Sequence, residues 1–585
     1  MPSETTPRRE SFHPRCVRFA LLAALLAAGL VGAGCEDTDK EKGMDLDPPQ
    51  PLTKDSVVKD YARLVATGYL PVEGYGVVIG LGTNGSREIP GALRRYLTDY
   101  LSKQDLGSWR EGTKGITPIK FLRDLDTAVV KVRGVIPPGA PKGHRFDIFV
   151  QAMPRSGTKT LSGGILMPLD LHLAGKWDVS QTQTHIWAKG NGPMFVNPYL
   201  SPDDPADAPK LRNGKVIGGG TVVRRRIIHL QLLKKDYSKA FLIKNRINAR
   251  FAKLREVAIG RSGSTIELVV PKQYSNNYSR FLDLALHLPL SYQVEGQILR
   301  IAEQMKDPRA DHNALGLTWE AIGRQVLPQV RQHYNSAHPT LSFYAARTGL
   351  RMGDPDAIEV MVRFARNHES PMQLAAVREL GNADGLGRAG DALRELLDSN
   401  NERVRTAAYE SLLRAGETSR VKRVVVGDDF ILDLVESGGR YAIYATQTQR
   451  PKIVVFGRDL SLRRDVFYRS PDEMVTVSSC KDEKTRKPRV MVYRRVPRGD
   501  MLSESLYLDF DVADLIETLG RRTDPDTRGN VHGLGLTYGE VLATLHGLCE
   551  RGHIPAKFIL QRSVGLQNDE DSTRPDIARP DMPEG

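Results

Sequence analysis

The chain has 585 residues, a length that usually corresponds to two to four domains. Hydrophobic residues make up 40% and charged residues 26%, which excludes a wholly disordered chain, a collagen-like chain and a polytopic membrane protein. Four cysteines exclude a scaffold built on disulfides. The net charge of +13 points to anionic partners but does not name one.

Residues 1–34 have the pattern of a secretory signal peptide. Four arginines precede an apolar run at 19–34, which as a helix would span only about 24 Å and is too short for the bilayer core. Small residues lead into Cys35, and this segment resembles a bacterial lipobox, in which the cysteine is acylated. Gly32 stands where leucine is usual, so ordinary cleavage and an uncleaved anchor stay open as alternatives.

The segment that follows is polar. Residues 35–54 are rich in charged residues and contain proline, so we expect a flexible tether between the membrane and the folded part. Removing the leader takes away four arginines and two glutamates and leaves a net charge of +11. An oxidising compartment would permit a disulfide between Cys480 and Cys549, and the sequence leaves this pairing open because it gives no distance.

A glycine-rich segment at 80–85 matches the dinucleotide-binding pattern G-x-G-x-x-G. It follows a strand-like run and precedes a helix-like stretch at 91–103, as in a Rossmann unit. The second hydrophobic strand of that unit is missing, because residues 104–118 are polar and rich in glycine. We therefore expect these glycines to permit tight turns and not to bind a nucleotide.

The same segment, GYGVVIGLGTNGS at 74–86, resembles the N-terminal signature of the bacterial flagellar P-ring protein family. Later blocks resemble that family in the same order, at 128–148, 161–169, 213–224 and 230–251. The resemblance covers roughly residues 55–295. It implies a mixed α/β ring-type domain, without an enzymatic activity, that forms a periplasmic ring of many copies around the flagellar rod.

Hydrophobic periodicity independently predicts an α+β fold for residues 55–295. In the strand expected at 145–152, Phe146, Ile148 and Val150 lie on one face, which should be buried, and Asp147 and Gln151 lie on the other. The predicted strands are 75–80, 127–134, 145–152, 221–233 and 264–270, and the predicted helices are 91–103, 237–254 and 277–288.

Residues 296–420 are rich in alanine, leucine and arginine and contain a repeat. Alanine pairs at 345–346, 375–376 and 407–408 recur after 30 and 32 residues, and a leucine follows each pair at the same offset. The segment resembles a HEAT-type array of stacked helices. An irregular helical bundle stays open as the alternative.

Short hydrophobic runs separated by polar breaks predict a β-rich domain at 421–565, with a closing helix at 537–551. The acidic, proline-containing tail at 566–585 should be disordered. The strands predicted in the β-rich domain are 430–435, 441–446, 452–456, 474–479, 489–494 and 506–510.

The chain lacks the usual sequence motifs for catalysis and metal binding. The chain has no His/Cys cluster with zinc spacing, no G-x-S-x-G elbow and no Walker A motif. We therefore expect no catalytic residue, no cofactor and no metal, although a metal site assembled from distant residues stays open.

Clustered basic residues are the candidates for contacts with an acidic partner surface or an anionic cell-wall polymer. Three of them fall in the strand expected at 221–233, so Arg225 should face opposite to its neighbours. The alternative is a solvated edge charge that discourages strand pairing. No aromatic residues are interleaved with these clusters, so we expect no nucleic-acid partner. The candidates are Arg94, Arg95, Arg224, Arg225, Arg226, Lys234 and Lys235.

These observations predict a non-enzymatic structural protein, lipid-anchored at Cys35, that is related to the flagellar P-ring subunit. The expected partners are further copies of the chain in a ring, the flagellar rod, other ring proteins, peptidoglycan and a membrane, the outer membrane being favoured. A non-flagellar envelope lipoprotein, acting as an adaptor through the ring-type domain and the repeats, is the alternative. An envelope hydrolase with a dispersed site is a third interpretation.

Overall fold

The computed structural model describes residues 56–561, with gaps at 66–67, 105–116, 176–184, 276, 292–293, 384, 386, 428, 449, 482–486, 496–501 and 524–530. The predicted signal peptide, tether and acidic tail lie outside the described residues. The described residues belong to one compact unit. Across the described part of the chain, no helix is both long and apolar enough to cross a membrane.

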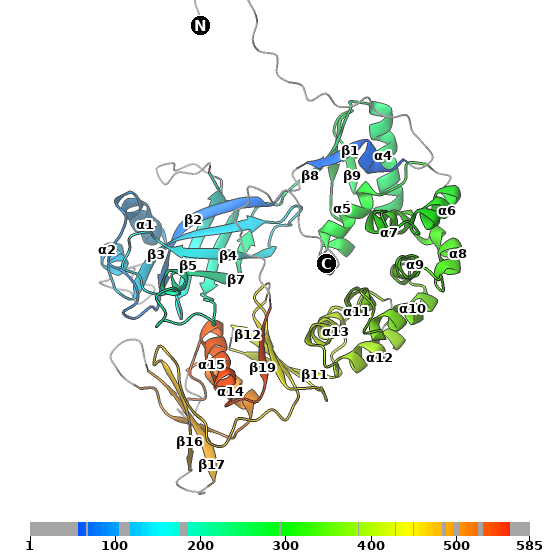
Figure 1. Cartoon of the computed structure of the whole chain (residues 1–585). Helices are drawn as coiled ribbons and strands as arrows, with labels where there is room; N and C mark the ends of the chain where they lie inside the picture. Colours follow the sequence, from blue (N-terminus) through cyan, green and yellow to red (C-terminus); the bar gives the residue numbers. More distant parts are fainter. Residues whose placement is uncertain are drawn as a thin grey trace, which may run out of the picture. The chain divides into compact units, whose positions relative to one another are not determined.

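Six strands between Leu70 and Val222 form a closed barrel with the strand order β2-β3-β4-β7-β6-β5 (Figure 1). In β4, Phe146, Ile148 and Val150 point into the barrel core, which confirms the predicted alternation. Leu93 and Leu97 of α1 pack on the outside of β2 and β3. The elements are β2 (Leu70–Ile79), β3 (Thr127–Ile136), β4 (Arg145–Ala152), β5 (Ile165–Leu173), β6 (Ala188–Pro193), β7 (Asn213–Val222), α1 (Gly91–Lys103), α2 (Pro118–Leu122) and α3 (Ala208–Leu211).

A second, four-stranded antiparallel sheet follows in the order β1-β8-β10-β9. Two helices cover one of its faces, where Ile243, Ile247 and Phe281 pack against Leu230 and Ile266. The elements are η1 (Val58–Asp60), β1 (Ala62–Val65), β8 (Ile228–Leu232), β9 (Ala258–Gly260), β10 (Thr265–Leu268), α4 (Tyr237–Phe251), η3 (Lys272–Tyr274) and α5 (Tyr278–Leu286).

The single strand predicted at 221–233 is wrong, because the structure divides it into β7 and β8. β7 belongs to the barrel and ends at Val222, whereas β8 belongs to the four-stranded sheet and begins at Ile228. The sequences of β7 and β8 have similar hydrophobic alternation, so the break between the two strands is not visible in the sequence. The break falls at the three arginines, Arg224 to Arg226. The guanidinium of Arg226 donates to the backbone oxygens of Gly68 (2.7 Å) and Ile136 (3.1 Å) and holds the crossing between the two sheets.

The middle of the chain is helical and confirms the predicted repeat. α9, α11 and α13 carry the three alanine pairs, and the leucines that follow them, Leu350, Leu380 and Leu412, are buried in one shared core. The elements are α6 (Glu295–Gln304), α7 (His312–Ile322), η4 (Arg324–Val326), α8 (Leu327–Val330), η5 (Arg331–His333), α9 (Pro339–Arg351), α10 (Pro355–Arg366), α11 (Gln373–Leu380), α12 (Gly387–Leu396) and α13 (Glu402–Arg414).

The last part contains a five-stranded sheet, β11-β12-β14-β13-β19, and a four-stranded sheet, β15-β16-β17-β18. The predicted strands and the closing helix are present, and four further elements (β11, β15, β19 and α14) were not predicted. The elements are β11 (Val421–Val426), β12 (Phe430–Val435), β13 (Ala442–Ala445), β14 (Lys452–Phe456), β15 (Phe467–Arg469), β16 (Val475–Lys481), β17 (Pro488–Arg494), β18 (Leu506–Leu508), α14 (Val512–Gly520), α15 (Tyr538–Glu550) and β19 (Lys557–Leu560).

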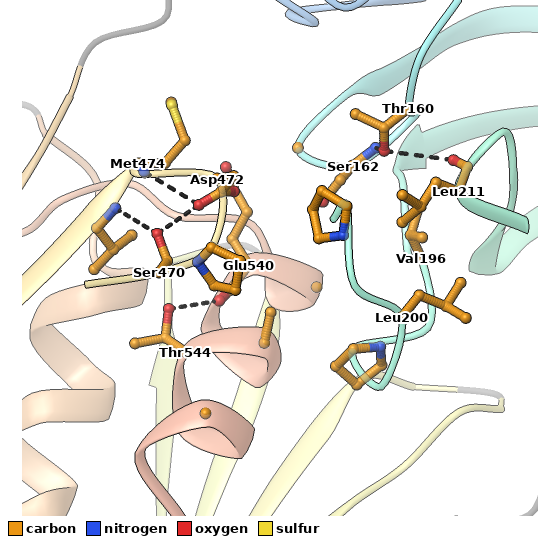
Figure 2. Close-up of a pocket in the computed structure, with 18 of the residues that line it drawn as sticks. Thr160, Ser162, Val196, Leu200, Leu211, Ser470, Asp472, Met474, Glu540 and Thr544 are labelled. Carbon is orange, nitrogen blue, oxygen red and sulfur yellow. Dashed lines mark hydrogen bonds between the residues drawn. The ribbon is translucent and has the colours of Figure 1, made fainter. Parts of the chain in front are cut away.

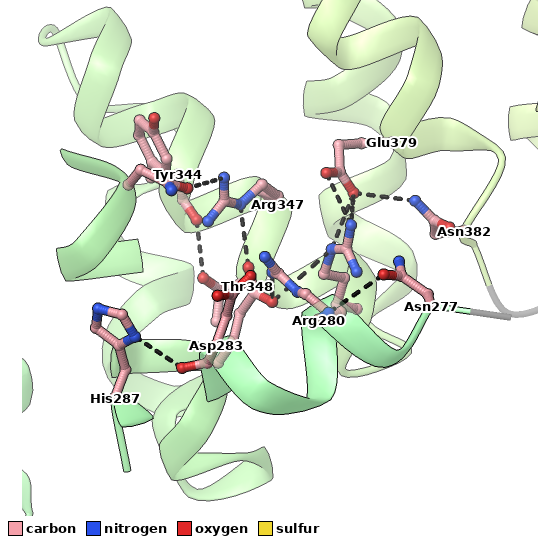
Figure 3. Close-up of polar contacts among 12 residues, drawn as sticks. Asn277, Arg280, Asp283, His287, Tyr344, Arg347, Thr348, Glu379 and Asn382 are labelled. Carbon is pink, nitrogen blue, oxygen red and sulfur yellow. Dashed lines mark hydrogen bonds and ion pairs between the residues drawn. The ribbon is translucent and has the colours of Figure 1, made fainter. Parts of the chain in front are cut away.

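Buried ion pairs join the α5 helix to the helical repeats (Figure 3). The Glu320 carboxylate on α7 is 1% exposed and accepts from Arg280 of α5 and from Arg347 of α9, the latter at 3.0 Å. Arg351 of α9 continues the network to Glu379 of α11 at 2.7 Å. The Glu320 carboxylate therefore lies between arginines of two different helices, so the network fixes α5 against the repeats.

The last repeat helix is joined to the five-stranded sheet by a shared core and a buried carboxylate. The hydroxyl of Tyr409 on α13 donates to Asp433 of β12 at 2.5 Å, and Arg423 of β11 binds the same carboxylate at 2.7 Å. Phe456 of β14 packs against the Tyr409 ring and beneath the guanidinium of Arg405. One continuous core therefore crosses residue 420, where we predicted a domain boundary.

Candidate partner-contact residues and cavity

The arginine cluster has three different surroundings. Arg224 is exposed, whereas Arg225 lies 3.6 Å from the Glu267 carboxylate of β10. Arg226 is half-buried, and burial lowers its pKa although Tyr278 opposes the shift. Because the residues lie in the connection between β7 and β8, strand alternation does not decide which way they face. Only Arg224 and Arg225 remain available to a partner surface, and contact with a partner stays a prediction.

The other candidate basic residues lie elsewhere on the surface. Arg94 and Arg95 are exposed on α1, which covers the barrel. Lys234 and Lys235 are exposed in the connection from β8 to α4. The arginine cluster and the lysine pair are separated by β8, whose five residues span about 17 Å. The structure therefore does not gather the predicted residues into one basic site.

Exposed aromatic residues beside the lysine pair were not predicted as functional. Tyr237 and Phe241 lie one turn apart on α4 and are 67% and 65% exposed. The ammonium of Lys235 lies 5.7 Å from the centroid of the Tyr237 ring. In the sequence, Tyr237 and Phe241 are visible as an aromatic pair four residues apart. Residues on the buried face of a helix have the same spacing, so the sequence does not show that this pair is exposed.

The glycine segment 80–85 is a turn that follows β2 and precedes α1. β2 pairs antiparallel with β3 and β5, so the parallel unit that binds dinucleotides does not form around it. Gly80 and Gly82 have φ of +80° and +62°, a conformation that glycine adopts without strain. The amide of Gly82 donates to the Asp126 carboxylate at 2.7 Å, which holds the turn against the start of β3.

A cavity of about 390 Å³ lies between this turn and α15 (Figure 2). Thr160, Ser162 and the 196–202 segment line one side, and Ser470 and Glu540 line the other. The Glu540 carboxylate accepts from the backbone and the hydroxyl of Thr537 at the start of its own helix. These contacts occupy the carboxylate in a helix cap, as expected of a packing seam between two parts of the chain.

The carboxylate of Asp472 at the cavity is occupied in the same way. It accepts from the Ser470 hydroxyl (2.5 Å) and from the Met474 amide (3.1 Å), as Figure 2 shows. In the wall of the cavity, the His546 ring contacts Tyr199 with centroids 4.5 Å apart. Burial lowers the pKa of the imidazole, although Glu550 opposes the shift. Aromatic packing across the seam therefore joins α15 to the barrel.

The remaining predicted residues are the cysteines. Cys35 lies outside the described residues. Cys480 on β16 and Cys549 on α15 are both half-buried, and burial raises the pKa of the Cys549 thiol to about 12. A thiol held in this way is a weak nucleophile at neutral pH. The pairing of the two cysteines stays a prediction.

Within the described residues, no group of three or more His, Cys, Asp or Glu side chains is placed to hold a metal ion. Comparison with known proteins finds two family matches. Residues 57–301 match the family described as flagellar P-ring protein, and residues 326–413 match HEAT repeats. Residues 57–301 are a flagellar P-ring protein domain.

Three flagellar P-ring proteins illustrate the relationship. The protein from Oleidesulfovibrio alaskensis is 26% identical over 295 residues, which cover 48% of this chain and 68% of that protein. The protein from Anaeromyxobacter dehalogenans is 30% identical over 205 residues, covering 33% and 49%. The protein from Burkholderia mallei is 25% identical over 228 residues, covering 37% and 56%. The chain therefore spans about half to two thirds of the length of these relatives.

The P-ring domain comprises the barrel and the four-stranded sheet, together with α4 and α5. The second match confirms HEAT repeats at residues 326–413 of the helical middle. The family match to the P-ring domain ends at residue 301.

Proposed function

We propose that this protein is a structural subunit of a flagellar P-ring-like assembly, which surrounds the rod in the periplasm and is held at a membrane by lipid on Cys35. The observation that carries the proposal is the match of residues 57–301 to the flagellar P-ring protein family. Relatives of that name support a position at the flagellar basal body, in the cell envelope. The subunit has a mechanical role and catalyses no reaction.

A ring of identical subunits needs head-to-tail contacts that close by rotation. The P-ring domain supplies these contacts through two different surfaces. Arg94 and Arg95 on α1, and Arg224 and Arg225 beside β8, are exposed basic groups that suit an acidic surface on the neighbouring subunit, the rod or the cell wall. These charges are separated on the domain, so they suit distinct partners.

The HEAT repeats supply a surface for a further envelope protein, since arrays of stacked helices commonly bind proteins. The buried network around Glu320 supports this role, because it holds the repeats against α5 of the P-ring domain. A partner bound to the repeats would then keep a fixed position relative to the ring.

Electron microscopy of the protein extracted with its native membrane tests the assembly. We expect rings around rods, together with loss of motility when the gene is deleted. Uniform monomers and normal motility would contradict the ring and favour the alternative, an envelope lipoprotein that acts as an adaptor through the same domain and repeats. Neighbouring genes for rod, hook and ring components would be an independent indication of the flagellar role.

Lipid attachment needs its own test. Intact-mass measurement of the membrane-extracted protein should give the chain that begins at Cys35 plus acyl groups. The Cys35→Ser variant should lack this mass and leave the membrane fraction. An unmodified N-terminus at another residue would contradict the anchor without affecting the ring.

A further inference from the structure

A small basic and aromatic patch lies where β8 leads into α4. We define the α4 patch as Leu233, Lys234, Lys235, Tyr237 and Phe241. All five side chains are exposed, and the two aromatic rings are exposed to about two thirds. Among the described residues, no ion pair involves either lysine. The patch therefore presents apolar surface together with uncompensated positive charge.

The patch is built on a fixed backbone. The ring of Tyr237 lies against Gly263 in the β9–β10 turn, where a Cβ atom would approach the ring to 2.9 Å. Asp236 caps α4 by accepting from the Lys239 amide at 3.0 Å, and it also pairs with the Lys239 ammonium at 3.5 Å. The one carboxylate within the 233–241 segment is thus already occupied. The N-terminal end of this 15-residue helix adds partial positive charge.

Apolar residues on the other faces of α4 make its core contacts. Ala240, Ile243, Ile247 and Phe251 are buried against the four-stranded sheet. Tyr237 and Phe241 therefore are not needed to hold α4 on the sheet. Exposed aromatic rings next to lysines are typical of side chains that enter a membrane interface, where the ring meets the acyl boundary and the ammonium meets lipid phosphates.

The described chain begins beside this patch. The hydroxyls of Ser56 and Tyr61 are hydrogen-bonded at 3.1 Å, and the backbone oxygen of Tyr61 accepts from the amide of Leu233 at 2.9 Å. The Lys239 ammonium lies 5.2 Å from the centroid of the Tyr61 ring. Ser56, the first described residue, thus lies at the same end of the sheet as the α4 patch.

We propose that the α4 patch binds the surface of an anionic phospholipid bilayer. The proposal rests on the proposed lipid at Cys35 for the membrane's proximity: the 20 residues at 36–55 reach at most about 70 Å when fully extended. A patch confined so close to a bilayer needs only weak intrinsic affinity, because tethering raises its effective concentration at the surface. Lipid and patch together would set the orientation of the P-ring domain at the membrane.

Vesicle binding by the chain that begins at residue 36 tests the patch separately from the lipid. This chain keeps every described hydrophobic core, since those cores begin at Val58. Co-sedimentation would compare phosphatidylcholine vesicles with vesicles that also contain phosphatidylglycerol. We expect roughly tenfold stronger binding to the anionic vesicles, weakened by salt.

The variants are Lys234→Glu with Lys235→Glu, and Tyr237→Ser with Phe241→Ser. Each double variant should reduce binding to anionic vesicles at least about fivefold, because one removes charge and the other removes the inserted rings. The matched control, Lys120→Glu with Arg123→Glu, changes two exposed basic residues at α2 and should bind like the unchanged chain. Circular dichroism would verify that all variants are folded.

Equal binding to both kinds of vesicle, or equal binding by the patch variants and the control, would overturn the proposal. Altered subunit assembly with unaltered vesicle binding would also overturn it and assign the patch to a protein contact. The tested chain carries no lipid, so its vesicle binding is independent of acylation. If this chain binds vesicles but the protein extracted from its native membrane is not acylated, only the proposed lipid anchor is rejected. An acylated N-terminus without vesicle binding would reject the patch alone.

Discussion

Gly85 shows, at the scale of a residue, why the G-x-G-x-x-G pattern occurs in a chain whose strands do not form a nucleotide-binding unit. A Cβ atom at this position would lie 2.2 Å from the backbone oxygen of Thr127 and 2.4 Å from that of Leu125. The Gly85 amide itself donates to Leu125 at 2.9 Å. The glycine is thus required for the close approach of this turn to the start of β3.

Gly85→Ala should lower the free energy of unfolding by about 2–3 kcal/mol, because backbone atoms must move to admit the methyl group. Urea unfolding followed by circular dichroism would measure the change. Gly91→Ala is the control, since nothing lies within 4 Å of its added Cβ and alanine favours the α1 helix. Equal stability of Gly85→Ala and the unchanged chain would refute the steric role.

Glu379 makes stability depend on pH. Burial alone would raise the pKa of this carboxyl, but the charge and hydrogen bonds of Arg351, with Arg347 and Arg280, lower it from 4.5 to about 2. A pKa depressed in the folded state stabilises the fold above the unfolded-state value and loses this contribution as the pH falls from about 4.5 towards 2.

The Glu379→Gln variant isolates this contribution. The difference in unfolding free energy between the unchanged chain and the variant should be largest near neutral pH and constant down to about pH 5. It should then shrink as the pH approaches 2, where Glu379 becomes protonated. A difference that does not change with pH would show that the carboxylate charge is not what stabilises this position.

At the scale of elements, most helices and strands could be predicted because their periodicity is local. The helix expected at 91–103 and the strand at 145–152 have the predicted bounds. β6 could not be predicted, since its sequence AKGNGP has no apolar alternation and it is a strand through its pairing with β5 and β7. The predicted helix 237–254 ends earlier, at Phe251, because Ala252 is already extended.

The functional residues were harder to predict than the elements. Sequence clustering identified Lys234 and Lys235, but it could not show that Tyr237 and Phe241 are exposed, since the pair has the spacing of a core face. In the sequence, Arg226 is indistinguishable from Arg225. In the structure, the guanidinium of Arg226 donates to two backbone oxygens. Burial and the partner of each side chain depend on tertiary contacts that neither composition nor spacing contains.

Glu320 joins elements that are far apart in the sequence, and its removal should loosen α5 from the repeats. The Glu320→Gln variant leaves Arg280 and Arg347 buried without the shared carboxylate. We expect a loss of about 3–5 kcal/mol in unfolding free energy, typical of breaking a buried ion pair.

The matched control for Glu320 is Glu303→Gln, which removes an exposed carboxylate paired with Lys306 and should have no measurable effect. Urea unfolding of both variants measures the difference. Hydrogen exchange should in addition show faster exchange in α5 and α7 of Glu320→Gln. Similar stability of the two variants would show that α5 is held to the repeats by apolar contacts alone.

At the scale of the whole molecule, the HEAT repeats and the C-terminal five-stranded sheet share one core. A substitution in that core should therefore destabilise both parts. Phe456 of β14 is fully buried between that sheet and the side chains of Arg405 and Tyr409 on α13. Phe456→Ala should cost about 3–5 kcal/mol, from lost apolar contact and the cavity that remains.

Hydrogen exchange measured by mass spectrometry shows which elements the Phe456→Ala substitution destabilises. In Phe456→Ala we expect protection to fall both in the sheet and in α13, because neither can close the cavity without the other. The control is Val425→Ala on the edge strand β11, where the side chain is 69% exposed and its loss should leave exchange unchanged. Faster exchange confined to residues 421–561 would mean that the C-terminal part unfolds independently of the repeats. The repeats would then bind their proposed partner without being stabilised by the sheet.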